Sequence, residues 1–280
     1  MRSNPAETLF NHGVRAVAIL VVVALALIVF HVLQRGMPRL DWEFLTSNPL
    51  RGGREGGIAP IIVSTVSVTA IAILVSCPLG IGIALLLEEA LLPASAFGRM
   101  IRTCLIMLAA TPSIVFGLVG NLLFCEWMGF GFSILAGGLT LSLMILPIVA
   151  CFAESALRSI PSGARLAAIA LGMPRWRVVG CVLIPLAIPG ILAGVALGIG
   201  RAVAESAALI FTSGYVDRMP SSVFDSGRTL AVNILDLAMN VPGGDETAYA
   251  SATVLLMSTT TVIATLFAIE RISNNRMGVA

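Results

Sequence analysis

Lysine is absent from this sequence, and all 17 of its strongly basic residues are arginine. A phosphate-binding loop of the Walker A type needs a lysine after its second glycine, so the chain contains no such loop. Charged residues are also scarce, at 11% of the chain, against about 25% in soluble domains. The net charge of +2 is too small to indicate a nucleic-acid partner. If ATP drives this protein, another subunit is expected to bind it.

Metal ligands and acid–base groups are few as well. The chain has five cysteines without a Cys-x-x-Cys motif, so we expect neither a disulfide framework nor a metal centre, and no cofactor. The two histidines, His12 and His31, lie near the ends of the first apolar segment. The alternative of an intramembrane enzyme therefore has little machinery for general acid–base catalysis.

Long apolar segments dominate what is present, since 58% of the residues are hydrophobic. Six segments are each long enough to cross about 30 Å of hydrocarbon at about 1.5 Å per residue. They are Val14–Leu33, Ile58–Leu87, Cys104–Phe124, Phe132–Phe152, Ile188–Ile210 and Ala248–Ile269. The sequence predicts an all-α, polytopic membrane protein in which residues 1–280 form a single transmembrane domain.

The arginines predict the orientation of this domain in the membrane. With the N-terminus inside, the inner segments carry ten arginines against five acidic residues, and the outer segments six against nine. The positive-inside rule then places both termini in the cytoplasm. Two long loops follow, a basic inner one over about 154–187 and an outer one over about 212–247. Within the outer loop, Thr229–Asn240 has the pattern of a short amphipathic helix.

The inner loop has the pattern of a helical hairpin. Ser162–Leu171 is rich in alanine, and Gly172 fits the left-handed position that ends many helices. Pro174 fits the first turn of a second helix, Arg175–Ile184, which is expected to end before Pro185. A plain surface loop that follows the positive-inside rule remains the alternative, because inner loops are generally rich in arginine.

This hairpin resembles the coupling loop of binding-protein-dependent ABC importer permeases. The family pattern is Glu-Ala-Ala, three residues, Gly, nine residues and Ile-x-Leu-Pro. The matching stretches here begin at Leu166-Ala167-Ala168, Gly172 and Val182, with Leu166 in place of the usual Glu. The resemblance implies that the loop contacts an ATPase through Leu166, Ala167, Ala168, Gly172, Arg175, Trp176 and Pro185.

Other stretches resemble phosphate-specific permeases, in particular their A-type subunit. They are Thr111–Leu118, Leu146–Val149, Glu154–Pro161 and Gly200–Ala207. The resemblance implies a type I ABC importer permease fold and a non-catalytic subunit in a bacterial inner membrane. It also implies a second homologous permease, two cytoplasmic ATP-binding subunits and an external phosphate-binding protein. Two alternatives to a phosphate permease remain: a permease for another oxyanion (phosphonate, sulfate or molybdate), and a secondary transporter.

Two charged residues inside the fifth apolar segment are candidates for the substrate path. Arg201 lies about 20 Å along the helix from Ile188, where an isolated arginine costs at least about 2.5 kcal/mol. Glu205 lies one helical turn further and is expected to pair with it on the face of the glycines at 190, 194 and 198, directed into the bundle. Arg201 then either binds an oxyanion through its planar fork or bridges two helices.

Two hydroxyl residues in the third segment are weaker candidates for the same path. Thr111 and Ser113 could donate hydrogen bonds to an oxyanion, but such residues often bond to their own helix instead.

Overall fold

A computed structural model describes residues 5–91 and 95–277 of the chain. In chain order, the helices are α1 (Pro5–Gly36), α2 (Trp42–Thr46), α3 (Ala59–Leu85), α4 (Ala96–Ala110), α5 (Ser113–Gly120), α6 (Ile134–Ser159), α7 (Ser162–Ala170), α8 (Arg175–Val178), α9 (Ile184–Val203), α10 (Ala207–Ile210), α11 (Leu230–Met239) and α12 (Asp245–Met277). Wider π-helical segments continue some of these: η3 (Leu86–Ala90) follows α3, η4 (Asn121–Trp127) follows α5, and η5 (Val179–Leu183) joins α8 to α9. Between α2 and α3, the short strands β1 (Pro49–Leu50) and β2 (Glu55–Gly56) pair antiparallel, with Pro49 opposite Gly56.

The described residues contain five continuous spans that are long and apolar enough to cross a membrane. They are Asn11–Arg39, Ala59–Ala90, Ile134–Ser159, Arg175–Val203 and Asp245–Arg271. The pair Ala96–Ala110 and Ser113–Trp127 is a sixth candidate, bent by 102° between its halves. The prediction of an all-α membrane protein is confirmed, and the count reaches six when the bent pair is taken as one span.

The third predicted span, Cys104–Phe124, is therefore wrong as a single helix. α4 ends at Ala110, and Thr111 takes an extended conformation with φ −71° and ψ 131°. The cause is Pro112, whose ring disfavours helical geometry in the residue before it. The chain then turns sharply into α5.

The fifth predicted span, Ile188–Ile210, is wrong at both ends. The second hairpin helix does not stop before Pro185, because α8, η5 and α9 form one span from Arg175 to Val203. The helix continues through Pro185 because the π-helical segment η5 comes just before it. Such a segment changes the backbone hydrogen-bond pattern at the place where proline has no N–H to donate. At the other end α9 stops at Val203, and helix resumes only at Ala207.

α6 forms the centre of the bundle. In its most apolar stretch 67% of the residues are buried by the chain itself, against 0% for α1. Glycine allows α3 to approach α6 closely: a Cβ at Gly138 would lie 2.6 Å from the Cβ of Ile71, and one at Gly80 would lie 2.9 Å from Cγ1 of Val149.

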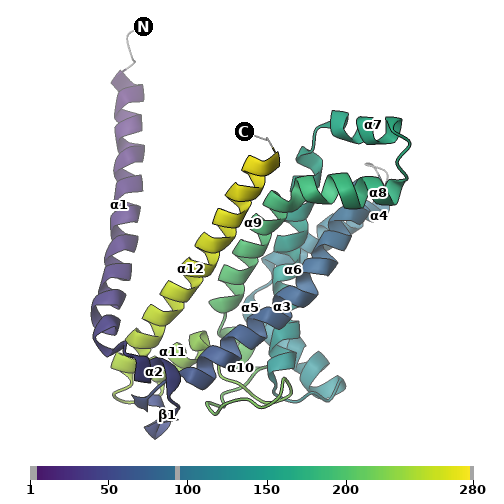
Figure 1. Cartoon of the computed structure of the whole chain (residues 1–280). Coiled ribbons are helices and arrows are strands. Elements are labelled where there is room, and N and C mark those ends of the chain that lie inside the picture. Colours follow the sequence, from purple (N-terminus) through teal and green to yellow (C-terminus); the bar gives the residue numbers. More distant parts are fainter. Residues whose placement is uncertain (1–4, 92–94, 278–280) are drawn as a thin grey trace.

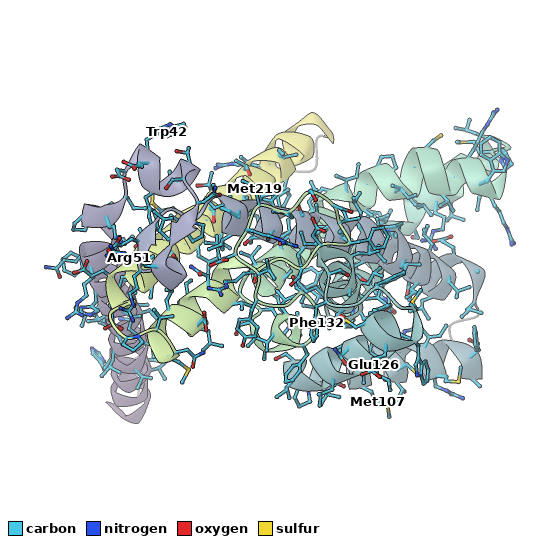
Figure 2. The ribbon with its side chains drawn as sticks, turned by 90° about the horizontal axis from the view of Figure 1, so that it is seen from below. Trp42, Arg51, Met107, Glu126, Phe132 and Met219 are labelled. Atoms are coloured by element: carbon cyan, nitrogen blue, oxygen red, sulfur yellow. The ribbon has the colours of Figure 1, made fainter. Side chains whose placement is uncertain are left out.

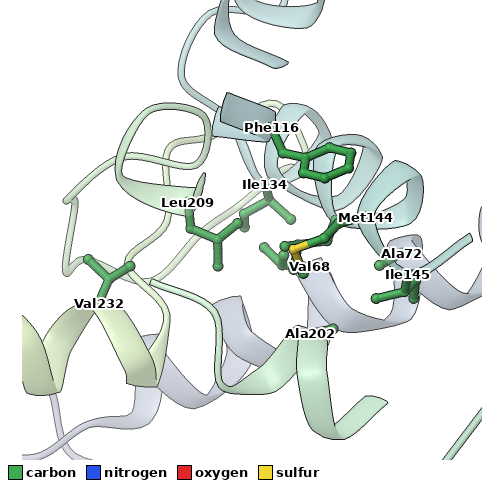
Figure 3. Close-up of a cluster of buried hydrophobic side chains, with 10 residues drawn as sticks. Val68, Ala72, Phe116, Ile134, Met144, Ile145, Ala202, Leu209 and Val232 are labelled. Carbon is green, nitrogen blue, oxygen red and sulfur yellow. The ribbon is translucent and has the colours of Figure 1, made fainter. Parts of the chain in front are cut away.

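The largest buried apolar cluster joins α6 to the interrupted spans (Figure 3). Its side chains come from α3, α5, α6, α9, α10 and α11, and they are Val68, Ala72, Phe116, Ile134, Leu141, Met144, Ile145, Ala202, Leu209 and Val232. The last turn of α9 and the short α10 are thus packed against the core on both sides of the break between them.

The two ends of the bundle differ in structure (Figure 1). The hairpin of α7 and α8 lies at the same end as the start of α1 and the end of α12, and α2, β1 and α11 lie at the opposite end. At that opposite end the long loop that joins α10 to α11, which carries Met219, spreads over the bundle (Figure 2). Within the loop, hydrogen bonds from Ser221 and Ser222 hold the pKa of the Asp225 carboxyl below its usual range. The predicted helix Thr229–Asn240 is present as α11.

Candidate functional site

The break after α9 separates the two charged residues that the sequence paired. Arg201 lies in the last turn of α9 and is exposed, whereas Glu205 follows the end of that helix and is buried. No ion pair joins them in the described part of the chain, so the predicted pair is wrong. Helical spacing of four residues brings side chains together only when the helix continues.

Each of the two charges has a different environment. The backbone N–H of Ala208 donates a hydrogen bond to Oε1 of Glu205 at 3.3 Å, so this carboxylate caps the start of α10. Arg201 makes no hydrogen bond or ion pair with any described residue. The guanidinium is thus left available on the surface of the isolated chain.

The predicted glycine stripe on α9 does form a close helix contact. A Cβ at Gly190 would lie 2.5 Å from the Cβ of Ala156, and one at Gly194 would lie 2.5 Å from the Cβ of Phe152. The stripe therefore fits α9 closely against another helix, as expected, and that helix is α6. The expectation that Arg201 points into the bundle with this stripe is wrong, because its side chain is exposed while the next residue, Ala202, is buried.

The segments that follow the two interruptions pack against each other. A Cβ at Gly117 of α5 would lie 2.8 Å from the Cα of Ala208 in α10. The side-chain amide of Asn121 donates to the backbone carbonyl of Phe211 at 2.7 Å. Sequence reasoning missed Gly117 and Asn121. The available signal was the pair of glycines at 117 and 120, which lie five and eight positions after the helix-breaking Pro112.

The two candidate hydroxyl residues flank the break before α5. The hydroxyl of Thr111 donates to the carbonyl of Met107 at 2.8 Å, so it bonds back to its own helix. Ser113 is half-buried and is the first residue of α5. Of these two residues, Ser113 is the one whose hydroxyl makes no hydrogen bond to another described residue.

The hairpin of α7 and α8 has the predicted turn. Gly172 has φ +73°, its N–H donates to the carbonyl of Ile169 at 2.9 Å, and the N–H of Met173 donates to Ala168 at 3.2 Å. These two bonds define a Schellman ending, which requires the left-handed glycine. Pro174 precedes α8 as its cap residue rather than lying within its first turn.

The outer surface of the hairpin is apolar and exposed. Leu166, Ile169, Leu171 and Trp176 are 64%, 57%, 81% and 69% exposed, respectively. The guanidinium of Arg177 lies 5.0 Å from the centre of the Trp176 ring. Among the predicted contact residues, Ala167 and Arg175 are exposed too, whereas Ala168 is buried and Pro185 is half-buried. A projecting patch of large apolar side chains at one end of a molecule is typical of an interaction surface.

Comparison with known proteins identifies the family. The family model described as "Binding-protein-dependent transport system inner membrane component" matches residues 76–278. The chain is 32% identical to the "Probable ABC transporter permease protein YqgI" of Bacillus subtilis (strain 168), over 81% of this chain and 82% of that protein. It is 31% identical to the phosphate transport system permease protein PstC of Mesorhizobium japonicum, over 81% of this chain and 78% of that protein. It is also 32% identical to PstA 2 of Mycobacterium bovis, over 68% of this chain and 62% of that protein.

Solved transporters share the fold. The inward-facing MetNI methionine ABC transporter matches with a TM-score of 0.60 at 16% identity, over 78% of this chain and 94% of that chain. A bacterial alginate ABC transporter, in complex with its pentasaccharide-bound periplasmic protein, matches with a TM-score of 0.64 at 12% identity, over 98% of this chain and 96% of that chain. The interrupted bundle and its hairpin thus form an ABC importer permease fold, and the chain belongs to the inner-membrane components of binding-protein-dependent transport systems.

Proposed function

We propose that this permease carries inorganic phosphate into the cell as part of an importer driven by ATP. As a member of its family, the chain is a transport component and not an enzyme. Relatives named as phosphate permeases of both the PstC and the PstA type support phosphate as the cargo. The structural relatives are named for methionine and alginate, so the shared fold does not choose among cargoes.

The exposed, unpartnered Arg201 is the observation that carries this proposal. It lies about 26 Å along α9 from Ile184 at 1.5 Å per residue. That places it near the far end of a hydrocarbon core of about 30 Å, where a charge costs less than the roughly 2.5 kcal/mol of the bilayer centre, so its side chain is expected to reach protein or water. Its planar guanidinium suits an oxyanion through two parallel hydrogen bonds. Arg201 then supplies fixed positive charge to the phosphate path. Ser113 supplies a hydroxyl donor, and Thr111 and Glu205 shape the two breaks.

The same exposure supports a second permease subunit. The face of α9 that carries Arg201 is not covered by this chain, and a homologous partner would complete a path between the two proteins. Because this chain has no Walker A lysine, ATP would be bound by two separate subunits. These subunits would dock on the hairpins of the two permeases. Leu166 and its exposed apolar neighbours would make that docking surface less polar than the usual glutamate does. An external phosphate-binding protein would deliver the anion to the end that carries α11.

The proposed orientation places the hairpin and both termini in the cytoplasm of a bacterial inner membrane. The arginine asymmetry of the sequence supports it. In intact cells, on a cysteine-free background, an impermeant thiol reagent should label Asn240→Cys and should not label Gly163→Cys. The reverse labelling would overturn the orientation.

Uptake by the assembled complex tests the cargo. Proteoliposomes with ATP inside and the binding protein outside should accumulate labelled phosphate, and excess unlabelled sulfate, molybdate or phosphonate should not suppress that uptake. If one of these anions suppressed phosphate uptake at a concentration below that of phosphate, that oxyanion would be the cargo instead. Uptake without ATP would favour a secondary transporter.

A further inference from the structure

Two adjacent carboxylates lie at the end of α3, close to the hairpin. Glu88 and Glu89 both belong to the π-helical segment η3. Consecutive residues on a helix point roughly a quarter turn apart. The two side chains consequently reach different neighbours, and neither neighbour is on α3 itself.

Glu88 belongs to a network of alternating charges that joins three helices. Its Oε1 lies 2.7 Å from Nη2 of Arg158 in α6 and 3.4 Å from Nη2 of Arg102 in α4. Oε1 of Glu154 in α6 lies 2.7 Å from Nε of Arg102 and 2.7 Å from Nη2 of Arg158. The carboxylate side chains are only 15% and 11% exposed. Each carboxylate therefore contacts both guanidiniums, and the ends of α3, α4 and α6 are held by one set of ion pairs.

Glu89 reaches the hairpin instead. Its Oε1 lies 2.6 Å from Nη2 of Arg165 in α7, and the two side chains are 22% and 35% exposed. The other attachment of α7 is apolar: Ala168 is buried in a cluster with Leu157, Val178 and Leu183. The Arg165–Glu89 contact is thus the charged link between α7 and the end of α3.

We propose that Glu88 and Glu89 form a relay that transmits movement of the docking hairpin to the interrupted third span. Displacement of α7 pulls on Glu89 through Arg165, and Glu88 passes the displacement to α4 and α6. Arg102 lies about 14 Å along α4 from Thr111 at 1.5 Å per residue. α4 then carries the displacement from Arg102 to the break at Thr111. This inference rests on the proposed function, since it requires ATP-binding subunits that move the hairpin.

The relay differs from a merely structural anchor in what its loss changes. An anchor fixes α7, so its removal lowers the amount of assembled complex. A relay connects two moving parts, so its removal leaves assembly intact and lowers the uptake obtained per ATP hydrolysed. The sign of the two charges matters little to a relay, provided that they remain opposite.

The test uses the full complex in proteoliposomes and measures both ATP hydrolysis and uptake of labelled phosphate, normalised to the co-purified ATP-binding subunits. Glu89→Gln and Arg165→Gln should each lower uptake per ATP about tenfold. The charge exchange Glu89→Arg with Arg165→Glu should restore at least half of it. Glu270→Gln removes a carboxylate at the same end of the bundle, from a residue that pairs with no described side chain, and should have no effect.

The outcomes separate the relay from the proposed function. Normal uptake per ATP in both single variants would overturn the relay while leaving the importer intact. A charge exchange no better than the single variants would overturn it as well, and so would a loss confined to assembly. If the wild-type chain binds no ATP-binding subunit, the proposed function fails and the relay with it.

Discussion

The two ends of the Arg175–Val203 span differ in what they expose. At the hairpin end, large apolar side chains such as Leu171 and Trp176 project outward, and Arg165 is paired with Glu89. At the other end the apolar residues are packed into the core, and the charge of Arg201 is exposed alone. An apolar surface suits a protein partner, and a free guanidinium suits an anion. The comparison indicates that the two ends serve different partners, and that their functions should fail separately.

The largest effect is expected at the exposed charge. Arg201→Gln should lower uptake of labelled phosphate at least about 30-fold, because losing one charged hydrogen-bonding partner costs about 2 kcal/mol or more. Arg201→Lys keeps the charge without the planar fork and should retain partial uptake. The measurement is uptake into proteoliposomes, normalised to assembled complex. Since Arg201 and Glu205 form no ion pair, adding Glu205→Gln should not rescue Arg201→Gln. Recovery in that double variant would contradict the anion role.

A smaller effect is expected at the hairpin turn. Gly172→Val should weaken binding of the ATP-binding subunit about tenfold, because a left-handed backbone costs a branched residue about 1–2 kcal/mol. Gly172→Asn is the matched control, since asparagine tolerates this conformation and should bind nearly as the wild type does. Co-purification over a range of subunit concentrations measures the difference. Equal binding by the two variants would show that the turn conformation does not matter for docking.

Between the two ends, the contact of α9 with α6 should respond to added volume. Gly194→Ala should destabilise the folded chain by about 1–3 kcal/mol, because its methyl group would overlap Phe152. Gly82→Ala makes the same change where nothing lies within 4 Å and should be neutral or slightly stabilising. Thermal unfolding of the detergent-solubilised protein compares the two. An equal melting temperature for both variants would contradict the close packing of these helices.

The smallest effect is expected at the buried carboxylate. Glu205→Gln keeps an oxygen that accepts from the N–H of Ala208, so uptake should change by less than about threefold. Glu205→Leu removes the acceptor and should lower the amount of folded protein instead. Uptake and yield measured side by side distinguish these results. A large loss of uptake in Glu205→Gln at normal yield would assign the charge of Glu205 to the path.

The hairpin could be predicted from sequence because its signals are local. A left-handed glycine at 172 and a proline at 174 constrain the backbone whatever the rest of the chain does. The end of α9 could not be predicted in this way, because no glycine or proline marks residues 204–206. The helix stops there while α10 packs on Gly117 of α5, a contact between residues about ninety positions apart. The predicted ion pair of Arg201 and Glu205 was wrong for the same reason, because it required the helix to continue past Val203.

Apolar length predicted the number of spans, but it predicted neither the break in the third span nor the two ends of the fifth. Pro112 interrupts the third span, whereas Pro78, Pro147 and Pro189 lie inside continuous helices. The sequence alone does not distinguish these prolines, because neighbouring helices can compensate for a missing hydrogen bond. The ion pairs of Glu88 and Glu89 were equally invisible, since their arginines come from three other helices.

One measurement tests the division between the two ends most directly. Complexes that carry Arg201→Gln or Gly172→Val are assayed together for bound ATP-binding subunit and for uptake of labelled phosphate per bound subunit. Arg201→Gln should keep the subunit and lose uptake. Gly172→Val should lose the subunit, and whatever complex remains should transport normally. Loss of the same property in both variants would contradict this division.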